Sequence, residues 1–278
     1  MRIGVVTDSA SDLPNDVVHQ LDVTVVPLDV RLGSTPTEEV RVLEPAEFWK
    51  LAARTPELPE TSAPSPGAFV EAFLSCRDTG AEAVICITIS SALSATYEAA
   101  RSAATAVAAD IRVEVIDSRS ATMGEGLLVI EAGELAQGSL PFEAIVDGVQ
   151  SAVGQLHVLG TLDTLDNLRR GGRIGTAQAL FGTMLQVKPV IEIRDGVVEG
   201  ESRQRTRSRS LKYLADKVNT AGPLKRLAVM HAAASDVSEF AAMLSPVALE
   251  HPLVVSFIGP VIGAHTGVGT IGVCYLRA

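Results

Sequence analysis

Residues 83–97 indicate the fold class most clearly: Ala83-Val84-Ile85-Cys86-Ile87-Thr88-Ile89-Ser90-Ser91-Ala92-Leu93-Ser94-Ala95-Thr96-Tyr97. Its apolar first half, residues 83–89, has the length and composition of a buried strand. The serines that follow open an alanine-rich helix, which we expect to reach about residue 108. An apolar strand that leads directly into a helix is typical of a βαβ unit with a parallel sheet.

The same alternation continues on both sides of this stretch. Strands are predicted at residues 2–7, 23–28 and 113–116, and helices at 45–54, 68–78, 122–136 and 142–152. Residues 8–14 carry signals for the start of another helix. We therefore expect an N-terminal α/β/α domain with a parallel sheet, over residues 1–152.

The pattern changes after about residue 157. Asp195-Gly196 lies between two apolar runs and predicts a β-hairpin. Further strands are predicted at 158–162, 226–230, 253–258 and 269–276, helices at 206–219 and 236–245, and a glycine-rich turn at 259–269; residues 183–193 are apolar. Hairpins mixed with helices indicate an α+β C-terminal domain, over residues 153–278. The fold class is thus α/β with two domains.

Composition limits the function. The 278 residues are 47% hydrophobic, which is enough for a large core, and the net charge of −10 argues against general nucleic-acid binding. The three cysteines form no CxxC motif, so we expect reduced thiols and a cytoplasmic protein. We see no signal peptide and no apolar stretch long enough for a membrane span.

Two hydroxyl clusters precede predicted helices. In Thr61-Ser62-Ala63-Pro64-Ser65-Pro66-Gly67, Ser65 suits the N-cap and Pro66 the first helical position, which leaves Thr61 and Ser62 in a loop. Ser91 follows the strand at 83–89, at the sheet edge where α/β proteins bind ligands. These hydroxyls either cap turns and helices or, as we hypothesise, form together an anion site.

Two further stretches contain side chains that are suited to binding an anion. His265 is the one polar side chain of any reach in the glycine-rich turn, where it is either structural or a donor to a carboxylate or phosphate. Arginines gather around Gly171-Gly172 and again at 203–209. They form either a solvated face or a docking surface for a phosphate or an acidic partner.

Sequence motifs for catalysis are weak. Asp8 follows the first strand and is either a nucleophile of phosphate chemistry or an ordinary helix cap. The sequence contains no GxxxxGK[ST], GxGxxG, GxSxG or HExxH motif and no clustered Cys and His for a metal.

Taken together, these stretches resemble the DegV family in order and spacing, over essentially the whole chain. The matching motifs are Val6-Thr7-Asp8-Ser9 with Asp12-Leu13, Thr61-Ser62-Ala63-Pro64-Ser65, Ser90-Ser91-Ala92-Leu93-Ser94-Ala95-Thr96-Tyr97, Leu168-Arg169-Arg170-Gly171-Gly172-Arg173-Ile174 and Gly259-Pro260-Val261-Ile262-Gly263-Ala264-His265-Thr266-Gly267. Ala95 replaces a common Gly and Val268 an expected Pro, and neither change removes a polar ligand.

The resemblance implies a fatty-acid-binding protein that encloses the acyl tail between its two domains and presents the carboxyl group to a separate fatty acid kinase. Thr61, Ser62, Ser91 and His265 would bind the carboxylate. Arg170, Arg173 and Arg203 would handle phosphate or dock the kinase.

We therefore expect a monomeric, non-enzymatic lipid carrier that needs no cofactor or metal and makes at most transient membrane contact. One rival is a phosphoryl- or acyl-transfer enzyme that uses Asp8 or Ser91 with His265. The other is a structural or regulatory protein without a ligand.

Overall fold

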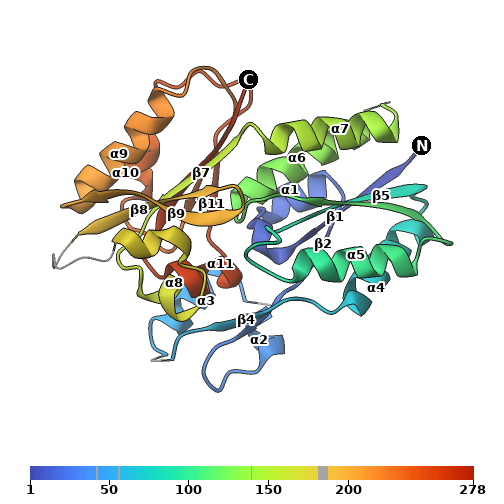
Figure 1. Cartoon of the computed structure of the whole chain (residues 1–278), viewed down its shortest axis with the longest axis horizontal. Helices are drawn as coiled ribbons and strands as arrows, with labels where there is room; N and C mark the ends of the chain where they lie inside the picture. Colours follow the sequence, from blue (N-terminus) through green and yellow to red (C-terminus); the bar gives the residue numbers. More distant parts are fainter. Residues whose placement is uncertain (42, 56, 139, 181–186) are drawn as a thin grey trace. The chain divides into compact units, whose positions relative to one another are not determined.

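The computed structural model describes residues 1–41, 43–55, 57–138, 140–180 and 187–278. Its contacts divide the chain into two compact units, whose elements are labelled in Figure 1. Unit 1 comprises Met1–Asp29 and Ser62–Gln155, and unit 2 comprises Val30–Thr61 and Leu156–Ala278.

Unit 1 is built on a parallel sheet, as the alternation of strands and helices predicts. Its strands are β1 (Ile3–Asp8), β2 (Val23–Val26), β5 (Ala83–Thr88) and β6 (Arg112–Asp117), in the order β2-β1-β5-β6. Every neighbouring pair is parallel. The four strands all end at one edge, so the residues after β1 and β5 are brought to the same side of the unit.

Helices cover both faces of this sheet (Figure 1). Val6 and Thr7 are neighbours in β1 and point to opposite faces. Val6 packs with Phe69 and Phe73 of one helix layer, and the Thr7 hydroxyl donates a 2.8 Å hydrogen bond to Glu125 of the other. The helical elements are η1 (Ser9–Ser11), α1 (Asn15–Gln20), α4 (Pro66–Asp78), α5 (Thr96–Ala106), α6 (Met123–Gln137) and α7 (Phe142–Val153). Unit 1 therefore has the predicted α/β/α architecture.

Unit 2 contains a mixed six-stranded sheet with the order β11-β10-β12-β7-β8-β9. The β10–β11 pair is parallel and the other pairs are antiparallel. Asp195 and Gly196 form the predicted hairpin between β8 and β9, with positive φ values of 52° and 83° that suit a type I′ turn. The strands are β7 (Leu156–Thr161), β8 (Lys188–Arg194), β9 (Val197–Gln204), β10 (Leu224–His231), β11 (Val254–Phe257) and β12 (Ile271–Arg277).

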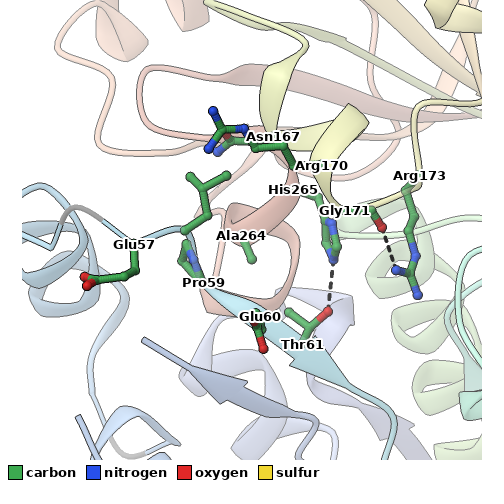
Figure 2. Close-up of a pocket in the computed structure, with 11 residues that line it drawn as sticks. Glu57, Pro59, Glu60, Thr61, Asn167, Arg170, Gly171, Arg173, Ala264 and His265 are labelled. Carbon is green, nitrogen blue, oxygen red and sulfur yellow. Dashed lines mark hydrogen bonds between the residues drawn. The ribbon is translucent and has the colours of Figure 1, made fainter. Parts of the chain in front are cut away.

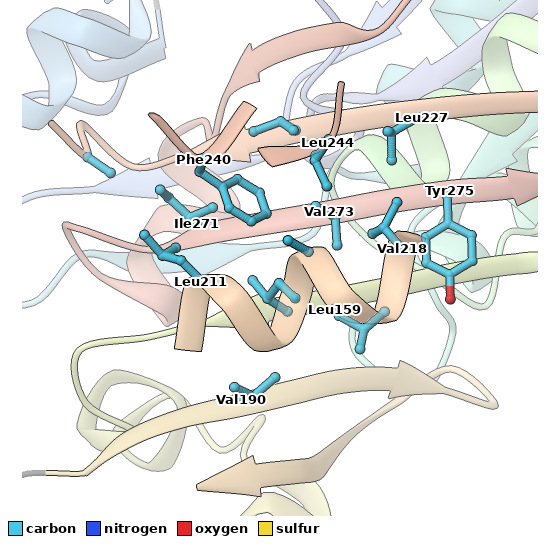
Figure 3. Packing of buried hydrophobic residues seen from close by; sticks show 14 of the residues in the cluster. Leu159, Val190, Leu211, Val218, Leu227, Phe240, Leu244, Ile271, Val273 and Tyr275 are labelled. Atoms are coloured by element: carbon cyan, nitrogen blue, oxygen red, sulfur yellow. The ribbon is translucent and has the colours of Figure 1, made fainter. Parts of the chain in front are cut away.

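Two helices, α9 (Arg207–Asn219) and α10 (Val237–Met243), supply the core on one face of this sheet. Leu211 and Val218 of α9 pack in one buried cluster with β12, where Leu211 lies beside Ile271 and Val218 lies near Tyr275 (Figure 3). Phe240 of α10 joins the same cluster. This buried layer stabilises the sheet. The segments that follow β7 and β11 leave this sheet and form part of the site described below.

The segment 30–61 packs with the C-terminal part of the chain. It contains β3 (Asp29–Arg31), α2 (Thr37–Arg41), α3 (Pro45–Ala52) and β4 (Glu60–Ser62), and β3 pairs with β4. Trp49 of α3 donates from Nε1 to the Ile258 carbonyl over 2.9 Å. The compact units therefore differ from the sequence-based division at residue 153, because the segment 30–61, which is far away in the sequence, belongs to unit 2.

Several local predictions were wrong in detail. Thr61 and Ser62 lie in the short strand β4 rather than in a loop. Residues 260–266 form the helix α11 (Pro260–Thr266) instead of a turn, because Pro260 suits a first helical turn and Gly267, at φ 80°, ends it.

Two helices begin later than predicted. The helix after β5 begins at Thr96, since residues 90–94 are held as a turn by hydrogen bonds from Leu93 and Ser94 N to the Ser90 carbonyl. The helix predicted from residue 8 begins at Asn15, after Pro14. Unit 2 also contains α8 (Asp166–Arg170) and η2 (Gly175–Leu180), and residues 183–186 of the predicted apolar stretch lie outside the described ranges.

Candidate functional site

A pocket of about 630 Å³ lies within unit 2 (Figure 2). Three segments far apart in the sequence form its wall: residues 57–61, the end of α8 with the turn after it, and α11. The lining residues are Glu57, Leu58, Pro59, Glu60, Thr61, Asn167, Arg170, Gly171, Arg173, Ala264 and His265. The pocket thus contains four of the seven predicted site residues: Thr61, His265, Arg170 and Arg173.

Thr61 and His265 are in direct contact. Strand β4 presents the Thr61 hydroxyl and the last turn of α11 presents the imidazole, and Thr61 Oγ1 lies 3.0 Å from His265 Nε2 (Figure 2). The two residues are 204 positions apart in the sequence. Their pairing turns two separate motifs into one polar group in the wall of the pocket.

His265 is neutral near neutral pH. Burial, together with the positive charge of Arg173, lowers the pKa of His265 from 6.5 to about 4. A neutral imidazole has one N–H and one lone pair, so it can orient a neighbouring hydroxyl without adding a charge. The fixed positive charges of the pocket are therefore the two arginines.

Gly171 allows the imidazole to take this position. A Cβ on Gly171 would lie 2.3 Å from His265 Nδ1, which is far inside van der Waals contact. The Gly171 carbonyl accepts a 2.6 Å hydrogen bond from Arg173 Nη1 (Figure 2). The sequence prediction noted Gly171 only as part of a short glycine pair, because its steric role becomes visible only when α11 packs on α8.

The pocket contains both signs of charge. The side chain of Arg170, exposed at the end of α8, forms no hydrogen bond or ion pair with any residue in the described ranges. Glu57 and Glu60 lie on another wall, and Glu60 forms an ion pair with Arg31. Arg170 is thus the cation that is available to an anionic ligand.

The predicted ligands Ser62 and Ser91 belong to unit 1. Ser62 follows Thr61 directly at the end of β4 and is exposed. Ser91 is also exposed, and its hydroxyl donates to Asp117 Oδ2 over 2.5 Å while its backbone N–H donates to Oδ1. Ser91 could donate to a ligand only by turning its proton away from Asp117.

The basic run at 203–209 does not form one patch. Arg203, on β9, donates to the Ala179 carbonyl and so supports η2. Arg207 forms a bidentate ion pair with Asp236, with both nitrogen–oxygen distances at 2.9 Å. These two arginines therefore have structural contacts within unit 2.

Asp8 is fully buried in unit 1. Oδ1 accepts from Ala10 N and Oδ2 from Ile89 N, each over 2.9 Å, so the carboxylate caps η1 and ties β1 to the end of β5. Burial raises its pKa from 3.8 to about 6. The neighbouring Glu125 is also fully buried, and desolvation followed by the charge of Asp8 raises its pKa well above 4.5. These bonds match the capping role that the sequence left open for Asp8.

The described ranges contain neither a metal-binding cluster nor a membrane-spanning helix. No three side chains among His, Cys, Asp and Glu come together there as a metal site. None of the helices in those ranges has the length and apolar character needed to cross a membrane.

Comparisons with known proteins extend over the whole chain. The model of a family described as "Uncharacterised protein, DegV family" matches residues 2–278. A DegV domain-containing protein of Streptomyces coelicolor is 35% identical over 279 residues, which cover 98% of this chain and 97% of that protein.

Two solved structures are similar along their full length. A DegV family protein from Thermus thermophilus, whose structure is described by its fatty acid binding, has a TM-score of 0.88 and 31% identity. DegV of Bacillus subtilis, described as a fatty acid binding protein, has a TM-score of 0.84 and 30% identity. Both comparisons cover 100% of each chain.

Proposed function

Because the chain belongs to the DegV family, we propose that it binds a long-chain fatty acid and presents the carboxylate to a partner fatty acid kinase for acyl-phosphate formation. It would act as a cytoplasmic carrier without chemistry of its own. The observation that carries the proposal is the Thr61–His265 pair in a pocket that also contains Arg170 and Arg173. The two solved relatives described as fatty-acid-binding proteins support the choice of ligand.

The head group is the costly part of such a ligand. Burying a carboxylate without hydrogen bonds costs several kcal/mol, so the pocket has to supply donors. Thr61 offers a hydroxyl and Arg170 a guanidinium that has no partner in the described ranges. We propose Thr61, Ser62, Ser91 and His265 as the carboxylate site, with Ser91 contributing least because it already donates to Asp117.

The acyl tail supplies the affinity. Each buried CH₂ contributes about 0.8 kcal/mol, so a long tail more than offsets the desolvation of the head group. A carrier built on this principle binds through the tail and controls the reactivity of the head group.

We further propose that Arg170, Arg173 and Arg203 serve the transfer step. Arg170 and Arg173 line the pocket beside the proposed carboxylate site, where an acyl phosphate would add negative charge. Arg203 would meet the kinase on the surface of unit 2. This assignment is weaker for Arg203, because its guanidinium donates to the Ala179 carbonyl.

Calorimetric titration of delipidated protein with a long-chain fatty acid tests the proposal. Thr61→Val, which removes the hydroxyl and keeps the shape, should weaken binding on the order of tenfold. Thr61→Ser is the matched control, since it keeps the hydroxyl, and it should bind like the wild type. Equal affinity of Thr61→Val and the wild type would remove Thr61 from the site.

A second assay addresses the partner. Arg170→Ala should lower the rate of acyl-phosphate formation by a fatty acid kinase. Arg101→Ala is its control, because Arg101 is an exposed arginine of α5 outside the pocket and outside both basic runs. Unchanged kinetics with Arg170→Ala would refute its role in transfer.

A further inference from the structure

The contact between Thr61 and His265 can run in two directions. Either Nε2–H donates to the hydroxyl oxygen, or the hydroxyl donates to a bare Nε2. Thr61 Oγ1 has no other hydrogen-bond partner among the described residues. The direction therefore decides whether the Thr61 proton is free for a ligand or already used.

The surroundings of the other ring nitrogen favour one direction. His265 Nδ1 is buried and has no hydrogen-bond partner in the described part of the chain. A buried N–H without an acceptor is rarer in proteins than an under-satisfied acceptor. An unpartnered Nδ1 is therefore better tolerated as a lone pair than as an N–H.

The charge beside the ring keeps His265 singly protonated. Gly171 lies against Nδ1, and its carbonyl accepts a hydrogen bond from the Arg173 guanidinium. The positive charge of Arg173 disfavours a second proton on the imidazole. The single ring proton therefore belongs on Nε2, opposite Thr61, because Nδ1 has no acceptor among the described residues.

We propose that Gly171 and Arg173 hold His265 as a fixed Nε2–H donor that turns the Thr61 hydroxyl proton toward the ligand. His265 is then a positioning residue and Thr61 the group that touches the head group. The contribution of this His265–Thr61 hydrogen bond to ligand binding rests on the proposed function, whereas the position of the ring proton does not. When Nε2–H donates to Thr61, the Thr61 hydroxyl can donate its own proton to the ligand. A donor suits a head group that can only accept hydrogen bonds, such as a carboxylate.

NMR of ¹⁵N-histidine-labelled, ligand-free protein at neutral pH tests the direction. Protonated and unprotonated ring nitrogens have well separated ¹⁵N shifts. The chain has five histidines, and the signal pair of His265 is the one that is lost in His265→Gln. We expect His265 to carry its proton on Nε2. A proton on Nδ1 would overturn the proposal, because Thr61 would then donate to His265.

A matched pair of glycine variants tests the positioning. Gly171 and Gly154 both end helices in right-handed conformation, at φ −74° and −71°. A Cβ at Gly171 meets the imidazole at 2.3 Å, while at Gly154 its first neighbour is 3.6 Å away. Gly171→Ala should shift the His265 signals and weaken fatty-acid binding on the order of tenfold, and Gly154→Ala should change neither.

The outcomes separate the two proposals. Unchanged His265 signals in Gly171→Ala would refute the positioning role even if fatty acid binds normally. A wild type that binds no fatty acid but has its proton on Nε2 would refute the proposed function and leave the donor assignment intact.

Discussion

A methyl group added at Gly263 should separate α11 from α3. The Cβ would lie 2.5 Å from Trp49 Cζ2 and 2.7 Å from Cη2, and Trp49 is only 5% exposed. The indole must therefore move, and with it the hydrogen bond from Nε1 to the Ile258 carbonyl. This change tests directly whether the segment 30–61 is an integral part of unit 2.

The expected loss of stability follows from three contributions. Overpacking costs about 1–3 kcal/mol, and loss of the indole hydrogen bond costs roughly another 1 kcal/mol. Replacing a helical glycine by alanine returns up to about 1 kcal/mol. We expect Gly263→Ala to lower the free energy of unfolding by about 2 kcal/mol.

Urea denaturation followed by tryptophan fluorescence measures this effect, because Trp49 is the only tryptophan in the chain. The native emission of the variant should move to longer wavelength as the indole gains water. Gly67→Ala is the control, since its Cβ has no neighbour nearer than 3.6 Å and α4 should tolerate it. A Gly263→Ala variant with wild-type emission and stability would refute the packing argument.

Three more predictions concern the pH dependence of stability and the backbone conformation at Gly175. His265 has a pKa of about 4 in the fold and 6.5 without it, so its contribution to stability is present above pH 6.5 and lost as pH falls toward 4; His265→Gln should flatten this part of a denaturation pH profile. Asp8 acts in the opposite sense: its pKa rises from 3.8 to about 6 on folding, so its contribution is full below pH 3.8 and lost as pH rises through 6. Asp8→Asn, which loses one capping acceptor, should therefore destabilise the fold more at pH 4 than at pH 7; an equal loss at both would contradict the pKa shift. Gly175→Ala should unfold at a lower temperature than Gly154→Ala, because Gly175 has φ +50° and its Cβ would lie 2.1 Å from the Val198 carbonyl oxygen; equal melting temperatures would argue against this strain.

Local chemistry made much of the fold predictable. The apolar strands at 83–89 and 226–230, the Asp195-Gly196 hairpin and the Ser65 cap with Pro66 all depend on neighbouring residues, and the structure confirms each. The family resemblance is confirmed as well, over residues 2–278.

Contacts between distant residues could not be predicted in the same way. Two contacts depend on how helices pack, which no local sequence pattern predicts. They are the hydrogen bond from Trp49 to the Ile258 carbonyl and the close approach of His265 to Gly171. The glycines at 259–269 predict a turn, but Pro260 begins the helix α11 there. Thr61 and His265 were candidates from their own motifs and from the resemblance, and the structure brings these two together. The binding roles of Thr61, His265, Ser62 and Ser91 all remain predictions.

Mass spectrometry of an organic extract of the purified protein shows whether the chain carries a fatty acid. A carrier predicts one long-chain fatty acid per protein molecule in this extract. An extract without lipid, from protein that also stays empty after incubation with fatty acids, would contradict the account.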